Sequence, residues 1–398
     1  MLGSINDAVD REMPSIVDDA LELIRMPSRN PPGEERCAEY IYLRLKELGM
    51  HTMLLYEPFK DRPQVIAYPS NIRAEDAIIL LNGHIDTVPE GSIEEWSVDP
   101  FSGIVKDGYI YGRGSSDMKS ALAVMMHICK IVEDARVILS FAIGEERAEP
   151  GTSTMLKHLY GMGIDRIKHG IVMEPTSLRI AACQMGALWF RVTIKGKAAH
   201  ASIPTAGTNA IVRACKVVDA LGSYVMSIEA RKGSYDGYAT NNSICSCIPR
   251  CSVTMIEGGV KENVIPDECS LTIDRRIAPY EDRSDVIGEI KALLDLHAGD
   301  YRMEVIAERS PVRIDESSML VSRLSSILAS IGINSNPSSW CFPGSTDNEY
   351  IVREGIESIV WGPGSIEQAH AVDEHISIDE IKVCTYALAS LLHTLYHD

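Results

Sequence analysis

The sequence predicts an α/β protein: a catalytic domain built on a mixed sheet with helices on both faces, interrupted by an inserted ferredoxin-like α+β domain. Three observations carry this prediction. Helical and strand-like patterns alternate through the first third of the chain, residues 181–310 change to the order strand–helix–strand–strand–helix–strand, and the α/β pattern then returns. We therefore predict a catalytic domain of residues 1–180 and 311–398 around a lid or dimerisation domain of residues 181–310.

Hydrophobic periodicity identifies the elements of the catalytic domain. Residues 77–82, AIILLN, form the continuous apolar run that is typical of a buried parallel strand. Similar patterns predict helices over residues 13–26, 35–48, 119–133, 152–161, 317–331 and 378–396, and strands over residues 64–68, 136–143, 170–173 and 357–361.

Alternation identifies the elements of the inserted domain. Residues 187–196, ALWFRVTIKG, alternate as a half-exposed antiparallel strand does. The order is completed by a helix over residues 208–221, strands over about 243–257 and 268–276, a helix over 283–297 and a strand over 301–308. This is the split βαβ arrangement of ferredoxin-like domains.

Length, composition and charge exclude several classes of protein. The chain has 398 residues, of which 45% are hydrophobic and 24% charged, as in ordinary globular proteins. A net charge of −18 disfavours binding to nucleic acid or to an anionic membrane surface. No apolar run is long enough to span a membrane, and the N-terminal segment is acidic where a signal peptide would be basic. We expect a cytoplasmic protein.

The ten cysteines are too sparse for a disulfide scaffold and form no C-x-x-C pair. Cys245, Cys247 and Cys251 lie close together, and two of them alternate along the predicted strand 243–257. We expect reduced, structural cysteines, with metal or redox chemistry as the alternative.

Acidic and imidazole side chains lie just past predicted strands, or in a Gly-rich loop, at points far apart in the sequence. They are His84, Asp86, Asp117, Glu145, Glu146, Glu174 and His370. The carboxyl ends of strands in an open α/β sheet form its ligand crevice, so these side chains should meet at one edge. A His and carboxylate set without thiolates favours catalytic Zn²⁺, Co²⁺ or Mn²⁺. It exceeds the needs of one tetrahedral ion, which predicts two ions sharing a carboxylate.

Each of these residues has a structural interpretation when taken alone. His84 could be an ordinary core histidine, and Asp117 could cap the helix 119–133. Glu145 and Glu146 could be a solvated strand end. Their joint occurrence at strand ends favours the metal site.

Motifs at these positions extend over nearly the whole chain. They are NPPGEE (30–35), GHIDTVP (83–89), GRGSSDMK (112–119), the pair at 145–146, EPT (174–176), GKAAHAS (196–202), NVIP (263–266) and GPGSIEQAH (362–370). In order and spacing the sequence resembles the dinuclear zinc aminoacylase and carboxypeptidase superfamily, and most of all its acetylornithine deacetylase and succinyl-diaminopimelate desuccinylase branch. It departs from the family at Gly144, where an aspartate is usual, and at residues 147–151, where a Gly-rich stretch is usual.

The resemblance implies a ligand for each position of a two-ion site holding Zn²⁺ or Co²⁺. Asp117 would bridge the two ions. His84 and Glu174 would complete one site, and His370 and Glu146 the other.

The resemblance also implies catalytic residues outside the ligand set. Asp86 would orient His84, and Glu145 would be the general base. His200, in the inserted domain, would donate a hydrogen bond to the oxyanion in the active site of a partner subunit. Pairing between exposed edge strands of two lids would form that homodimer.

The implied reaction is hydrolysis of the amide bond of an N-acyl amino acid. N-succinyl-LL-2,6-diaminopimelate is the predicted substrate, followed by N-acetylornithine and then by peptides. The non-enzyme alternative is an inactive binding protein of the same fold. Substrate carboxylates could be held by Arg179, Arg275 or Lys197, each of which could equally be a surface charge. Asn263, Ser345 and Thr346 are further substrate-binding candidates, although residues 344–346 could form a plain turn.

Overall fold

The computed structural model describes residues 2–29, 33–233, 247–335, 337 and 340–397. These divide into two compact units. Unit 1 comprises Met1–Ala182, Ile314–Pro337 and Thr346–Asp398, and unit 2 comprises Cys183–Arg313 and Ser338–Ser345, as far as these ranges are described. The segment ending at Ser345 thus groups with unit 2, whereas the predicted boundaries assigned it to the catalytic domain.

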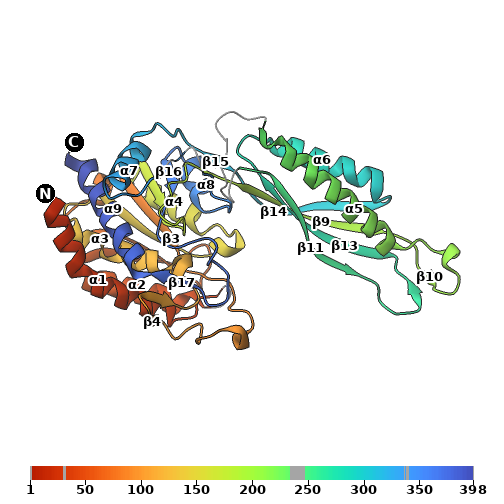
Figure 1. Cartoon of the computed structure of the whole chain (residues 1–398), viewed down its shortest axis with the longest axis horizontal. Coiled ribbons are helices and arrows are strands. Elements are labelled where there is room, and N and C mark those ends of the chain that lie inside the picture. The colour runs from red at the N-terminus through yellow and green to blue at the C-terminus, as the bar shows by residue number, and fades with distance from the viewer. Residues whose placement is uncertain (1, 30–32, 234–246, 336, 338–339, 398) are drawn as a thin grey trace. The chain divides into compact units, whose positions relative to one another are not determined.

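Unit 1 is built on a six-stranded mixed sheet in the order β1-β2-β6-β3-β7-β16 (Figure 1). Its strands are β1 (Met50–Leu55), β2 (Gln64–Pro69), β3 (Ile79–His84), β6 (Val137–Ala142), β7 (His169–Val172) and β16 (Glu357–Val360). The β6-β3-β7-β16 part is parallel, while β1 and β2 pair antiparallel at one side. The predicted mixed-sheet α/β class is confirmed.

Helices cover both faces of this sheet because both faces of its strands are apolar. On β3, Ile79 and Leu81 pack into one core cluster and Leu80 into another on the opposite face. The larger cluster is completed by α1 (Leu2–Ile24), α2 (Glu34–Glu47), α3 (Ser120–Ile131), α7 (Met319–Ser330) and α9 (Ile378–His397). The smaller is completed by α4 (Gly151–Gly161) and α8 (Asn348–Arg353). A three-stranded sheet of β4 (Ile104–Lys106), β5 (Tyr109–Tyr111) and β17 (His375–Ser377) completes unit 1.

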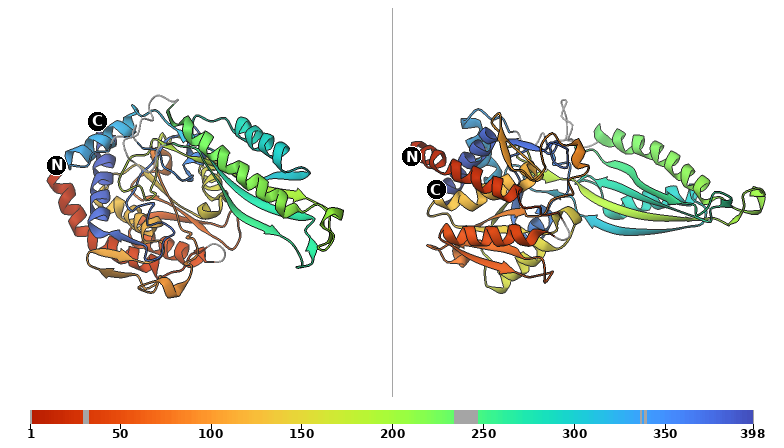
Figure 2. Two further views of the ribbon diagram at one scale, coloured as in Figure 1. Left: turned by 45° about the vertical axis from the view of Figure 1, so that its right-hand side comes forward. Right: turned by 90° about the horizontal axis from the view of Figure 1, so that it is seen from below.

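Unit 2 is a four-stranded antiparallel sheet in the order β11-β13-β9-β14 with two helices (Figure 2). Its main elements are β9 (Gly186–Lys195), α5 (Ala210–Glu229), β11 (Arg250–Gly258), β13 (Glu268–Ile277), α6 (Arg283–His297) and β14 (Tyr301–Arg309). Two short pairs join β8 (Cys183–Gln184) with β15 (Val312–Arg313), and β10 (Ala199–His200) with β12 (Val264–Ile265). The chain order and strand order are those of the predicted ferredoxin-like domain.

Two expectations about local structure were wrong. The helix predicted over residues 13–26 begins at Leu2, because the helix continues through Pro14. The cysteines are not all reduced, since Cys247 and Cys341 form a disulfide across 94 residues, a pairing that spacing alone does not reveal.

Some predicted features lie outside the described residues. They are Cys245, the start of the predicted strand 243–257 and the first three residues of the motif at 30–35. Within the described part of the chain, no helix has the length and apolar character to cross a membrane.

Candidate metal centre

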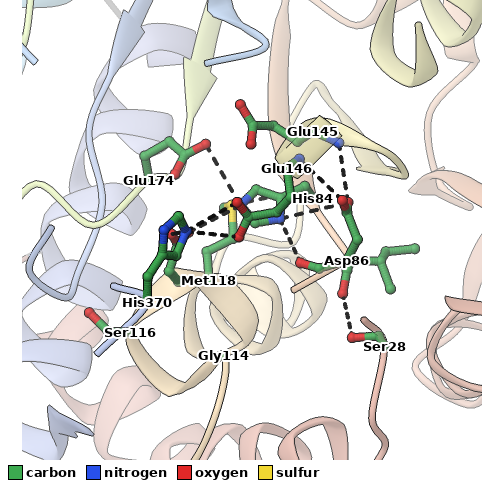
Figure 3. Close-up of polar contacts among 12 residues, drawn as sticks. Ser28, His84, Asp86, Gly114, Ser116, Met118, Glu145, Glu146, Glu174 and His370 are labelled. Carbon is green, nitrogen blue, oxygen red and sulfur yellow. Dashed lines mark hydrogen bonds and ion pairs between the residues drawn. The ribbon is translucent and has the colours of Figure 1, made fainter. Parts of the chain in front are cut away.

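The candidate ligands come together because four parallel strands end at the same edge of the unit 1 sheet. His84 is the last residue of β3, and Glu174 lies two residues beyond β7. Glu145 and Glu146 form a short turn after β6, and His370 lies in the loop after β16. Asp117 arrives from outside the sheet, in the loop that leads into α3. Figure 3 shows His84, Glu146, Glu174 and His370 pointing toward one another.

The two carboxylate oxygens of Asp117 face different histidines. Its Oδ1 lies 3.1 Å from His84 Nε2, and its Oδ2 lies 3.6 Å from His370 Nε2. Glu174 Oε1 is 3.9 Å from His84 Nε2, and Glu146 Oε2 is 3.1 Å from His370 Nε2. Asp117 therefore sits between two pairs of ligand groups, each with one histidine and one glutamate.

Glu145 lies beside the His84 half of this cluster. The ligand atoms of His84, Glu145 and Glu174 all lie within 4.8 Å of one another, as do those of His84, Asp117 and Glu146. Position alone thus allows Glu145 to be either a base or a ligand, and metal analysis of variants must separate the two.

The donor set fits divalent cations. Asp117 and Glu174 are buried, and Glu174 Oε1 has no hydrogen-bond partner among the described residues. Burial raises the pKa of Glu174 well above its usual range; His84 opposes this rise, but the charges of Asp117, Glu145 and Glu146 add to it. Four carboxylates converge here with two imidazoles, so the cluster lacks positive charge, which one or two divalent ions would supply.

Metal uptake is expected to release protons. The hydrogen bond between His370 and Glu146 raises the pKa of the His370 imidazole to about 8, although burial lowers it. At pH 7 that imidazole is mostly protonated in the metal-free protein, and it must lose its proton to bind an ion. Zn²⁺ affinity should therefore fall as the pH drops below 8, because more of the His370 imidazole is then protonated.

Calorimetric titration of metal-free protein at pH 7, in two buffers with different enthalpies of ionisation, measures this release. The observed heat should differ between the buffers, and the difference should shrink at pH 9. Equal heats in both buffers at pH 7 would contradict the expectation.

The model of peptidase family M20/M25/M40 matches residues 80–394 of the chain. The chain belongs to this family. The match extends from β3 to the last helix and confirms the resemblance seen in the motifs. As a family M20 protein, the chain is a metal-dependent hydrolase.

Curated relatives of this M20 protein carry different activities in their names. The chain is 25% identical to succinyl-diaminopimelate desuccinylase of Thioalkalivibrio sulfidiphilus. The alignment covers 96% of this chain and 99% of that relative. The chain is also 26% identical to N-formyl-4-amino-5-aminomethyl-2-methylpyrimidine deformylase of Bacillus subtilis. This alignment covers 95% of this chain and 94% of that relative.

Solved structures support the fold of both units. The M20 metallo-carboxypeptidase Sso-CP2 of Sulfolobus solfataricus matches with a TM-score of 0.74 at 20% identity, over 95% of this chain and 98% of its own. The dipeptidase Dug1p of Saccharomyces cerevisiae matches with a TM-score of 0.76 at 14% identity, over 100% of this chain and 99% of its own.

Asp86 holds the M20 site differently from the expected arrangement. The nearer partner of His84 Nδ1 is the main-chain oxygen of Asp86, at 2.8 Å, and the Asp86 carboxylate lies 3.8 Å away. That carboxylate instead accepts hydrogen bonds from the backbone N–H groups of Gly144, Glu145 and Glu146, at 2.9, 3.3 and 3.2 Å. Asp86 therefore orients His84 through its backbone and the glutamate pair through its side chain.

Gly144, where the family usually has aspartate, suits this turn. Its φ of 79° is in the left-handed region, and a Cβ there would lie 2.5 Å from Glu149 Oε2. Glu149 in turn accepts a hydrogen bond from Arg62 Nη1 at 2.7 Å, and Arg62 is also paired with Glu34. The departures at 144 and 147–151 are thus linked, because Glu149 occupies the space beside Gly144.

Glu374 is a site residue that the sequence reasoning missed. Its carboxylate is fully buried and accepts from the backbone N–H groups of Gly114, Ser116 and Asp117 at 3.0, 2.8 and 3.0 Å. Arg113 Nη1 donates to it at 2.7 Å. Glu374 thereby fixes the loop that carries Asp117. The sequence carries no local signal for this role, because the burial of Arg113, which requires an acidic partner, is visible only in the structure.

Glu374→Gln is expected to weaken binding of both ions by about 10–100-fold, as loss of groups that orient ligands commonly does. Turnover of this variant should return at saturating metal. If the loop that carries Asp117 had collapsed, added metal would not restore turnover. Competition with a chelating dye measures the affinity. Glu367→Gln is the matched control, because Glu367 is exposed and lies with Glu374 in the loop between β16 and β17. Unchanged affinity in Glu374→Gln would show that Asp117 is positioned without it.

Two of the substrate-binding candidates lie in unit 1. Arg179 is half-buried, five residues beyond Glu174. Thr346 is buried, and its Oγ1 accepts a hydrogen bond from the backbone N–H of Asn348 at 3.1 Å, at the start of α8. Thr346 therefore has a structural contact of the kind the plain-turn interpretation predicted.

The remaining candidates lie in unit 2. His200 on β10 and the exposed Asn263 are close together, because β10 pairs with β12 and the Ala201 backbone N–H donates to Asn263 O at 3.0 Å. Lys197 is exposed. Ser345 is half-buried, and its hydroxyl donates to Met185 O at 2.8 Å.

Arg275 does not suit its predicted role. Its side chain is fully buried in unit 2, and its Nη2 donates to Glu281 Oε1 at 2.6 Å. Its Nε donates to Tyr224 Oη at 2.9 Å, and its Nη1 donates to Glu281 and to the Arg276 carbonyl. A guanidinium engaged in this way is a structural ion pair of the lid core, so Arg275 is withdrawn as a carboxylate-binding residue.

Proposed function

We propose that this M20 protein hydrolyses the amide bond of N-acyl amino acids with two divalent ions, Zn²⁺ or Co²⁺, and that N-succinyl-LL-2,6-diaminopimelate is its substrate. The observation that carries the reaction class is the convergence of two histidines and four carboxylates at the sheet edge, with Asp117 between the two histidines. The named desuccinylase relative, aligned over nearly the full length of both chains, supports the substrate.

Each residue of the cluster has a chemical task in this reaction. Asp117, His84, Glu174, His370 and Glu146 would hold the ions. When bound, the two cations polarise the amide carbonyl and the attacking water. Glu145 accepts a proton from that water as its oxygen adds to the carbonyl carbon. Glu145 then gives the proton to the nitrogen of the leaving amine. Asp86 keeps Glu145 and Glu146 in place through their backbone N–H groups.

N-acetylornithine is the second candidate substrate, and peptides are the third. The deformylase relative adds an N-formyl amine to this set. A panel of these four substrate types separates the candidates, using metal-free protein restored with Zn²⁺ or Co²⁺. The desuccinylase proposal requires kcat/KM for N-succinyl-diaminopimelate to exceed that for every other substrate. A preference for another acyl group overturns the substrate but not the reaction class, and metal-free protein is the blank.

We also propose a homodimer formed through the lid. The outer strand β11 is an edge of the unit 2 sheet, and its Met255 and Ile256 side chains are exposed. A second copy could pair with this edge and cover these side chains. Cytoplasmic location stays a prediction.

His200 is proposed to act in the partner's active site. The Ser202 backbone N–H lies 3.2 Å from His200 Nδ1, so Nδ1 accepts and the neutral ring carries its proton on Nε2. The exposed imidazole can thus donate from Nε2 to an oxyanion. Loss of one such donor typically costs about 10²–10³ in turnover.

Mixed dimers are expected to recover activity. His200→Ala and Glu145→Gln subunits should each be inactive, but a mixed dimer has one site with both groups intact. Random reassociation of equal amounts makes half of the dimers mixed, so about one quarter of wild-type activity should return. His297→Ala, at an exposed position in the same unit, should keep full activity by itself. Dimers that form without any recovery would rule out action across the interface.

A further inference from the structure

Three buried cysteines of unit 2 meet away from the metal centre. Cys247 and Cys341 are joined by a disulfide with a Cα–Cα distance of 5.6 Å, within the usual range for such bonds. The sulfur of Cys183, on β8, lies 3.6 Å from that of Cys247. All three sulfurs lie within 4.8 Å of one another. A reduced thiol therefore touches a disulfide.

Backbone pairing holds Cys183 and Cys341 on neighbouring segments. The Phe342 N–H donates to Cys183 O at 2.9 Å, and the Met185 N–H donates to Phe342 O at 3.0 Å. Residues 341–342 thus run beside β8, with Gln184 opposite Phe342. The backbone at Cys247 is held by Tyr280, whose Oη donates to the Cys247 carbonyl oxygen at 2.9 Å. Cys183 and Cys341 are therefore held on neighbouring backbone segments, next to the same sulfur.

The other buried cysteines among the described residues of this unit do not share this arrangement. Cys251 and Cys269 are also buried, but they pack into the main core of unit 2 rather than into the small cluster around Cys247. Burial of cysteine is thus common in this unit. Contact between a thiol and a disulfide is specific to Cys183 among its described cysteines, which makes Cys251 a matched control.

We propose that Cys183, Cys247 and Cys341 form a thiol–disulfide exchange site. The Cys183 thiolate attacks Cys247 Sγ and forms a new S–S bond as the Cys247–Cys341 bond breaks. The electron pair leaves with Cys341 Sγ, which takes up a proton equivalent to the one that Cys183 lost. No oxidant or reductant is consumed, because one disulfide replaces another.

The two linkages are expected to have comparable stability. They close loops of 94 and 64 residues, respectively. Loop-closure entropy varies slowly with length, so this factor favours one linkage over the other by only about twofold. The exchange would transfer the covalent link of Cys247 from the segment at Cys341 to β8.

Linkage mapping of the wild-type holoenzyme tests the proposal. The protein is equilibrated at pH 8 in a glutathione buffer that retains one disulfide per chain. It is then quenched with acid, alkylated, digested and analysed by mass spectrometry. Both the Cys247–Cys341 and Cys183–Cys247 peptides are expected, with populations within roughly tenfold of each other. Absence of the Cys183–Cys247 peptide would overturn the proposal.

Three variants test the exchange without relying on the ratio of the two disulfides in the wild-type protein. Cys341→Ser should close Cys183–Cys247 in the same buffer, and Cys183→Ser should show only Cys247–Cys341. Cys251→Ser should show both linkages. If folded Cys341→Ser protein keeps Cys183 and Cys247 as separate thiols or glutathione adducts, exchange does not occur. A metal ion that is retained by the wild type and lost in Cys183→Ser would also overturn the proposal, because the sulfurs would then be ligands.

Discussion

Glu145→Gln is expected to abolish turnover while the protein keeps its metal. The amide preserves the shape of the side chain but cannot accept a proton, and general base catalysis typically contributes about 10²–10⁴-fold. The backbone N–H of Glu145 would still be held by Asp86 at 3.3 Å, so the turn should survive the change. Metal content of the purified variant, measured together with its kcat, gives the result.

The neighbouring glutamate provides the discriminating comparison. Glu146 contacts His370 at 3.1 Å, so Glu146→Gln should weaken one ion site first and lose activity through the loss of metal. Glu39→Gln, at an exposed position on α2, is the control for the charge change alone. If Glu145→Gln loses an ion and Glu146→Gln does not, the roles of base and ligand are reversed.

Asp117→Ala is expected to disrupt both ion sites together. Each oxygen of Asp117 faces a different histidine, at 3.1 and 3.6 Å, so removing the carboxylate takes a negative charge from both positions. Losing a group that only orients a ligand costs about 10–100-fold in affinity, and losing a shared ligand should cost at least the upper end of that range for each ion.

Single-site variants are the reference for this experiment. Glu174→Ala and His370→Ala should each weaken mainly one of two ions, which stepwise titration with Co²⁺ can resolve. If Asp117→Ala bound one ion with wild-type affinity, Asp117 would belong to a single site, and the bridging role would have to be abandoned.

The sequence by itself was sufficient for the order of the elements and the set of converging acids. An apolar run such as residues 77–82 needs no distant partner to be recognised as a buried strand, because its pattern is local. The position of His84 at the end of that strand then follows from the topology of parallel sheets. The ferredoxin-like order of unit 2 was readable for the same reason, since each strand and helix carries its own periodicity.

Only the tertiary structure decided which polar groups hold one another. The carboxylate of Asp86 reaches residues 144–146, Glu374 reaches the loop of Asp117, and Arg275 is paired with Glu281 inside the lid. The disulfide joins Cys247 to Cys341, although the cysteines nearest to Cys247 in sequence are 245 and 251. A hydrogen bond or disulfide depends on positions fixed to within about an ångström, and local periodicity specifies which face a residue occupies but not which distant group it meets.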